Sequence, residues 1–132
     1  MDQELDFAPM TLNRRLSSLS GLYRLARVGL VTPLYDGMNL VAKEFVAAQD
    51  PKDPGALVLS EFAGAAEQLD GAVLVNPHDI MATADAIHAA IVMPVEDRRA
   101  RWQALEAAVR AKSIAWWRNE FLAALEATRT GR

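Results

Sequence analysis

Short apolar runs alternate with longer amphipathic stretches along most of the chain. Three apolar runs, at residues 28–33, 56–60 and 72–76, have the length and β-branched content typical of buried parallel strands. Residues 40–49, between the first two runs, carry apolar positions at helical spacing. Strand, helix and strand in this order predict a βαβ unit with a right-handed crossover.

Capping residues predict further helices around this unit. Ser17 or Ser18 is expected to cap a helix that ends at Arg27. Asp79 is expected to cap the helix that follows the third strand, and Ser113 the last helix of the chain.

Apolar positions indicate how these helices pack. A short helix is expected over residues 61–68, where small side chains at residues 64–66 allow close approach to a neighbour. The helix after Asp79 carries one apolar face, formed by Ile80, Ala84, Ile87 and Ile91. Pro94 suits the first turn of the next helix. That helix is expected to turn three side chains inward: Trp102, Leu105 and Val109.

The number of strands limits the fold that this chain can form. Three to four strands are predicted in 132 residues, whereas a doubly wound nucleotide-binding domain has roughly six. We therefore expect residues 1–132 to form one truncated, partial Rossmann-like α/β domain, equivalent to the second half of such a domain. Residues 94–132 are expected to be its helical tail.

Composition narrows the function classes. Hydrophobic residues make up 52% of the chain, and the absence of cysteine excludes disulfides and thiolate metal sites. The formal net charge of −3 comes without a basic stripe, so no nucleic-acid partner is expected. No apolar run reaches the roughly 18 residues of a membrane span, and the acidic N-terminus is unlike a signal peptide. We therefore expect a cytoplasmic protein without a membrane partner.

Three other groups of residues are interpreted as structural. His78 and His88 have no third ligand at metal-binding spacing, so no metal site is expected. The basic run at residues 98–101 shares its helix with acidic residues and is interpreted as a solvated face. Of the adjacent Trp116 and Trp117, one is expected in the core and the other against a neighbour or at an interface.

The turn at residues 35–39 is the best candidate for a ligand site. It joins a strand to a helix and contains neither a dinucleotide-binding nor a Walker motif. Gly37 removes a Cβ that would keep a ligand off the backbone or forbid a positive φ. Asn39 is expected to cap the helix, which leaves the amides of Leu40 and Val41 at the positive end of the helix dipole. Such a helix mouth suits a diphosphate.

Two carboxylates flank this turn. Glu44 lies one helical turn after Leu40 on the same face, and helical side chains lean toward the N-terminus, so its carboxylate could accept both hydroxyls of a ribose. Asp36 could accept hydroxyls of a second sugar. On spacing alone a second interpretation stays open, in which Asp36 only shapes the turn and Glu44 is solvated. Ser60 and Glu61 are weaker candidates for lining the same crevice.

The amino-acid sequence of this stretch also resembles that of a known protein family. Residues 28–44, VGLVTPLYDGMNLVAKE, and residues 57–66, LVLSEFAGAA, resemble the trehalose-6-phosphate synthase family of retaining, two-Rossmann-domain (GT-B) glycosyltransferases. The resemblance covers about residues 12–125, and DGMNLVAKE is its most specific part. It implies glucosyl transfer from UDP-glucose to glucose 6-phosphate, in trehalose biosynthesis, without a metal or other cofactor.

The resemblance also implies a role for each residue of the turn. The donor glucose would be held by Asp36, Gly37, Met38 and Asn39. Backbone amides of Leu40 and Val41 would bind the diphosphate, and Glu44 would bind the ribose. Tyr35 departs from the family, which often has an arginine at that place.

The resemblance does not cover the family's acceptor-binding domain or the first half of its donor domain. Because transfer requires donor and acceptor to be clamped between two domains, we expect no catalysis by this chain alone and assign no catalytic residue. A separate N-terminal half-enzyme or a second copy of the chain is a candidate partner. The alternative interpretation is a non-catalytic, regulatory module that pairs with a full-length or split glycosyltransferase.

Overall fold

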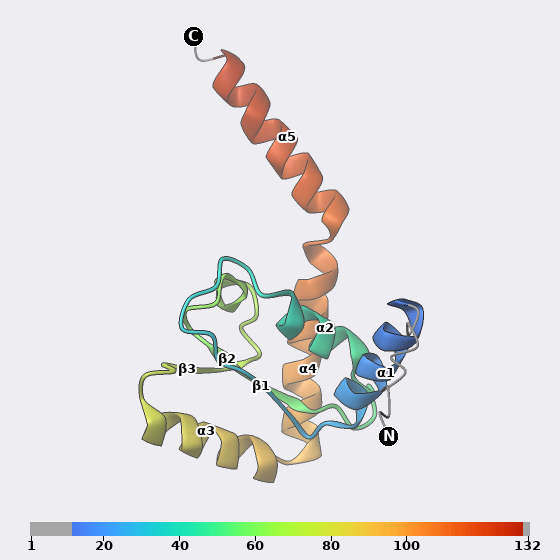
Figure 1. Ribbon diagram of the computed structural model, residues 1–132, viewed down its shortest axis with the longest axis vertical. Coiled ribbons are helices and arrows are strands. Elements are labelled where there is room, and N and C mark those ends of the chain that lie inside the picture. Colours follow the sequence, from blue (N-terminus) through green and yellow to red (C-terminus); the bar gives the residue numbers. More distant parts are fainter. Residues whose placement is uncertain (1–11, 131–132) are drawn as a thin grey trace, which may run out of the picture.

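A computed structural model describes residues 12–130 and contains one parallel sheet of three strands in the order β1-β2-β3 (Figure 1). The strands are β1 (Val28–Val31), β2 (Ala56–Ser60) and β3 (Val73–Val75). Val28 pairs with Ala56, and Ser60 with Val75. The predicted α/β fold with a small parallel sheet is therefore confirmed.

Helices cover both faces of the sheet (Figure 1). They are α1 (Leu12–Leu25), α2 (Leu40–Ala48), the 3-10 turn η1 (Gly64–Glu67), α3 (Ile80–Val92), α4 (Val95–Ala111) and α5 (Ile114–Thr130). Leu57 and Leu59 of β2 pack against α1, α2 and α4, whereas Val58 packs against α3. This alternation gives two apolar clusters, as expected for a strand that is buried on both faces.

The first helix begins earlier than expected. It starts at Leu12, so Ser17 and Ser18 lie inside the helix and the expected serine cap is wrong. It ends at Leu25 because the next residues already join the sheet: the carbonyl of Arg27 accepts a hydrogen bond from the amide of Ala56, with 3.0 Å between nitrogen and oxygen.

Helix α3 follows the predicted cap but packs through small side chains. The carboxylate of Asp79 accepts a hydrogen bond from the amide of Ala82 at 2.9 Å. The core contact is made by Ala90, which is buried, and by the half-buried Ala86. Ile80 and Ile91, on the expected apolar face, are exposed. A helix that meets the sheet through alanines lies close to it and leaves its longer side chains at the rim.

Helix α4 belongs to the core, whereas α5 extends away from the body of the molecule (Figure 1). Leu105 is buried and Trp102 and Val109 pack beside it, which confirms the predicted inner face. The expected cap of α5 is also present, because Ser113 Oγ accepts a hydrogen bond from the amide of Trp116. Both Trp116 and Trp117 are exposed, so the expected core tryptophan is wrong. No helix in the described part of the chain is long and apolar enough to cross a membrane.

The basic run at the start of α4 is a solvated face only in part, because Arg99 and Arg101 are exposed whereas Arg98 is not. Arg98 is buried and donates hydrogen bonds to the carbonyls of Met93 and Pro54 and to the carboxylate of Asp53. The neighbouring Arg99 donates to a carbonyl of the same link before β2. The run therefore anchors α4 to the segment that leads into the central strand.

Candidate functional site

Two loops meet at the carboxyl end of the sheet, one after β1 and one after β2. The amide of Asp36 donates to the carbonyl of Phe62 at 3.3 Å. In the opposite direction, the amide of Gly64 donates to the carbonyl of Asp36 at 2.9 Å, and that of Ala65 to the carbonyl of Met38 at 2.7 Å. These bonds fix the backbone of the predicted ligand turn against η1.

The side chain of Asp36 organises the turn from within. Its Oδ1 accepts a hydrogen bond from the amide of Met38 at 3.2 Å, and its Oδ2 accepts one from the Nδ2 group of Asn39 at 2.9 Å. A carboxylate offers about four acceptor positions, so lone pairs remain after these two bonds. Turn-shaping and ligand-binding roles for this half-buried carboxylate are therefore compatible.

Asn39 caps α2, as predicted. Its Oδ1 accepts a hydrogen bond from the amide of Ala42 at 2.9 Å. Of the two reasons considered for a glycine at position 37, a positive φ does not apply, because none of the described glycines has one. The positive φ of the turn, 80°, lies at Asn39. Asparagine adopts a positive φ more readily than most residues, and here the bond to Asp36 holds it in place. The space next to Gly37 is open, because a Cβ built there would meet nothing within 4 Å. With glycine at this position, a ligand can approach the backbone directly.

The mouth of α2 is open. The side chains of Met38, Leu40 and Val41 are exposed. Between residues 12 and 130 no protein acceptor is found for the amides of Leu40 and Val41, whereas Ala42 is already bonded to the cap. Glu44 is exposed one turn further along the helix. The structure thus brings the predicted residues together on one accessible surface.

The structure gives Ser60 and Gly64 other roles than those predicted from the sequence. Ser60 was a candidate for lining the crevice, but it is buried and its Oγ accepts the amide of Phe62 at 3.1 Å, so it shapes the second loop. Gly64 was expected to allow close packing but was not placed at the site. A Cβ on it would lie 2.2 Å from the carbonyl oxygen of Gly37. Its signal in the sequence was the run of small residues that it begins.

The charges around the turn bear on what it can bind. Asp36 and Glu44 place carboxylates in the turn and in the helix after it. The half-buried Lys43 donates its ammonium group to Gln68 Oε1 at 3.2 Å. Within the described residues no cluster of three or more histidine, cysteine or acidic side chains could hold a metal ion. At the turn itself, the described residues therefore offer an anion the amides and the helix dipole, without a basic side chain among residues 35–42.

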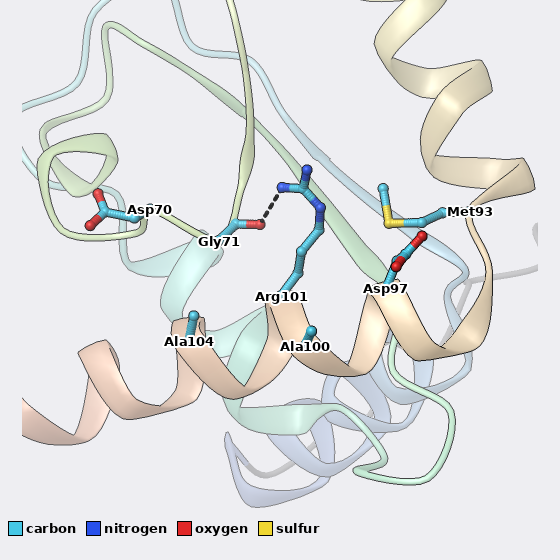
Figure 2. Close-up of a pocket in the computed structure, with 7 residues that line it drawn as sticks. All are labelled: Asp70, Gly71, Met93, Asp97, Ala100, Arg101 and Ala104. Atoms are coloured by element: carbon cyan, nitrogen blue, oxygen red, sulfur yellow. Dashed lines mark hydrogen bonds between the residues drawn. The ribbon is translucent and has the colours of Figure 1, made fainter.

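A cavity of about 500 Å³ lies at the opposite, amino end of the sheet (Figure 2). Asp70 and Gly71, just before β3, form one side of it, and α4 forms another. Figure 2 shows Arg101 of α4 donating to the carbonyl of Gly71, with 3.1 Å between nitrogen and oxygen. This contact ties α4 to the sheet and is separate from the ligand turn.

Comparison with known proteins decides the family. A family-wide sequence profile, Glycosyltransferase family 20, matches residues 4–127. The chain belongs to glycosyltransferase family 20. The trehalose-6-phosphate synthase of Sinorhizobium fredii (strain NBRC 101917 / NGR234) is 53% identical over 127 residues, which cover 94% of this chain and 27% of that protein.

Solved structures agree with this assignment. A trehalose 6-phosphate synthase from Burkholderia multivorans superposes on this family 20 chain with a TM-score of 0.81 and 53% identity, over 86% of this chain and 24% of that one. An E. coli structure described as bound with UDP-2-fluoro glucose superposes with a TM-score of 0.78 and 48% identity, over 81% of this chain and 24% of that one. The chain thus spans about a quarter of the length of the relatives it matches.

Proposed function

We propose that this family 20 chain carries part of the nucleotide-sugar donor site of a trehalose-6-phosphate synthase. The reaction of the complete site is glucosyl transfer from UDP-glucose to glucose 6-phosphate. The observation that carries the proposal is the capped mouth of α2, where two open amides are flanked in the sequence by two carboxylates, Asp36 and Glu44. It is supported by a relative solved with UDP-2-fluoro glucose and by a Burkholderia xenovorans relative solved with glucose-6-phosphate.

In this proposal the turn holds the donor glucose. The lone pairs that remain on Asp36 accept sugar hydroxyls. The backbone of Gly37, Met38 and Asn39 forms the surface beneath the ring, where no Cβ intervenes at Gly37. The amide of Met38 already donates to Asp36 at 3.2 Å, so a sugar hydroxyl that binds there shares or replaces this long bond.

The helix mouth binds the diphosphate in the same proposal. The amides of Leu40 and Val41 donate to it, and the helix dipole favours its charge. Glu44 accepts the ribose hydroxyls one turn later. Since Asp36 and Glu44 repel phosphate, full neutralisation requires basic groups from outside this surface. We therefore propose that the chain binds the donor weakly. We also propose that residues 1–132 form one domain, whose helical end is residues 94–132.

A second candidate function rests on exposed apolar surface. Leu30 of the edge strand β1 is exposed, and so are Ile114, Trp117 and Phe121 along α5. An uncovered edge and helix of this kind are typical of surfaces that pair with another polypeptide. A non-catalytic module that pairs with a separate glycosyltransferase polypeptide is therefore the alternative. A clean monomer in light scattering, with little dye-detected apolar surface, counts against it.

Titration of the purified chain with UDP tests the first proposal. Ligand-observed NMR or calorimetry should show weak binding, which Glu44→Ala should weaken by roughly tenfold and so bring below detection. The matched control is Asp85→Ala, which removes one exposed carboxylate from α3 and should bind UDP like the wild type. Absence of UDP binding by the wild type at millimolar ligand contradicts a working donor site.

A further inference from the structure

The two loops of the site lie against each other at Gly64. A Cβ built on Gly64 would lie 2.2 Å from the carbonyl oxygen of Gly37, 2.8 Å from its carbonyl carbon and 3.4 Å from the Cα of Met38. All three are backbone atoms of the ligand turn, so no flexible side chain can move aside. Any residue other than glycine at this position displaces the turn itself.

The turn that Gly64 contacts is held on both sides of the contact. The amide of Gly64 donates to the carbonyl of Asp36 at 2.9 Å, and the next amide, of Ala65, donates to the carbonyl of Met38 at 2.7 Å. Gly37 lies between these two acceptors. The backbone from Asp36 to Met38 therefore lies directly on the start of η1.

The position of this backbone decides the geometry of the helix mouth. Asp36 holds Asn39 through the bond between Oδ2 and Nδ2, and Asn39 keeps a positive φ of 80° while it caps α2. The directions of the amides of Leu40 and Val41 follow from that cap. A shift of the turn is thus passed to the atoms that are proposed to bind the diphosphate.

We infer that Gly64 is a positioning residue of the donor site. It touches no ligand, and it acts by allowing η1 to seat the turn at residues 36–38. The expected effect of Gly64 on ligand binding rests on the proposed function. The effect of Gly64 on the position of the turn does not depend on any ligand. A small displacement of binding groups is enough to lower affinity markedly.

Gly71 provides a matched control for steric damage. A Cβ there would lie 2.5 Å from the carbonyl oxygen of Arg101, a comparable clash with backbone at the opposite end of the sheet (Figure 2). Gly71→Ala should lower stability without altering the ligand turn. Gly21→Ala, at an exposed position of α1 where a Cβ meets nothing within 4 Å, should leave the ligand turn unaltered and raise stability slightly, because alanine favours a helix interior over glycine.

The experiment records amide correlation spectra of the isotope-labelled chain without ligand, and then titrates UDP. Gly64→Ala should move the amide resonances of residues 37–42 and weaken UDP binding on the order of tenfold or more, the loss of at least one hydrogen bond to the charged diphosphate. Gly71→Ala should move resonances around α4 and leave the UDP affinity of the folded protein unchanged. If Gly64→Ala leaves residues 37–42 where they were, or if Gly71→Ala weakens UDP binding equally, the positioning role is wrong.

Hydrogen exchange in the wild type keeps the inference testable if Gly64→Ala fails to fold. The amides of Gly64 and Ala65 should exchange as slowly as sheet amides, because both donate to the ligand turn. Exchange at the rate of unprotected amides overturns the contact. If the wild type shows this protection but binds no UDP, the proposed function fails while the positioning contact stands.

Discussion

The guanidinium of Arg98 lies 2.6 Å from the carboxylate of Asp53, although the Arg98 side chain is only 5% exposed and that of Asp53 is 67% exposed. Nε and Nη1 of the guanidinium also donate to the carbonyls of Met93 and Pro54. A buried cation with these three hydrogen bonds joins the start of α4 to the link before the central strand. Because β2 precedes one of the two loops of the candidate site, we expect this anchor to support that site from a distance.

Arg98→Met should lower the free energy of unfolding by roughly 2–3 kcal/mol. The substitution keeps most of the buried volume but leaves two carbonyls without their charged donor, and hydrogen bonds to charged groups contribute about 1.5–3 kcal/mol. Arg99→Met is the matched control, since Arg99 is exposed and its loss should cost less than about 1 kcal/mol. Urea unfolding measures both, and equal effects would contradict an anchor at Arg98.

Acid should weaken the same anchor. The hydrogen bond and the positive charge of Arg98 hold the pKa of the Asp53 carboxyl below its ordinary value. A lowered folded pKa contributes stability that is present above the unfolded pKa of about 3.9 and is lost as the pH falls through the folded pKa. Wild type should therefore be more stable than Asp53→Asn at neutral pH. The difference in stability should shrink as the pH falls below about 3.9.

Salt provides the control for this pH effect. Asp53 is largely exposed, so added salt at neutral pH should also reduce the difference between wild type and Asp53→Asn. Urea unfolding at several pH values and salt concentrations measures it. A difference that stays constant down to strongly acid pH would show that ionised Asp53 does not stabilise the fold.

Features governed by local periodicity were predicted well from the sequence. The bounds of β2, the Asp79 cap and the inner face of α4 all follow from nearby residues, and the structure confirms them. The turn and its Asn39 cap were likewise recognisable, because strand, turn and helix are contiguous in the chain. The prediction of a specific ligand came from the resemblance of this stretch to a known family, because the spacing of the residues alone left the ligand open.

Features that depend on distant partners were missed. Arg98 resembled a solvated basic run because Asp53, its partner, lies 45 residues away. A positive φ was one of two reasons considered for Gly37 on its residue type, but it is found at Asn39, where the side chain of Asp36 holds the turn. The contact of Gly64 with the turn depends on how two loops align at the end of the sheet; the run of small residues around it indicates close packing but not the partner.

Asn39→Ala should destabilise the chain by about 2 kcal/mol. Loss of a helix cap costs about 1 kcal/mol, and a positive φ at a residue other than glycine or asparagine costs about another. Asn39→Gly separates these terms, since glycine accepts the backbone conformation and, as a cap, costs only a few tenths of a kcal/mol relative to asparagine. Denaturant unfolding of both variants should place Asn39→Gly close to wild type. Equal destabilisation by the two substitutions would argue against a conformational cost at this position.

Removal of α5 should leave the fold intact. The described side chains of this helix, residues 114–128, are exposed, and the helix extends from the body (Figure 1). A chain that ends at Ser113 should unfold cooperatively, with a free energy within about 0.5 kcal/mol of the full chain. Its remaining tryptophan, Trp102, donates to the carbonyl of Val46 and reports on the core by fluorescence. A large loss of stability would show that α5 covers apolar surface in solution.

The role of Glu44 can be separated from its charge by changing the sugar of the ligand. If its carboxylate accepts the ribose hydroxyls, Glu44→Ala should weaken UDP binding by roughly tenfold, the value of one hydrogen bond to a charged group. The same substitution should weaken 2′-deoxy-UDP binding less, because this ligand offers the carboxylate only its 3′-hydroxyl and the lost negative charge no longer repels the diphosphate. Asp85→Ala should affect neither ligand. Equal weakening of both ligands would show that Glu44 does not contact the 2′-hydroxyl, even if the site binds UDP.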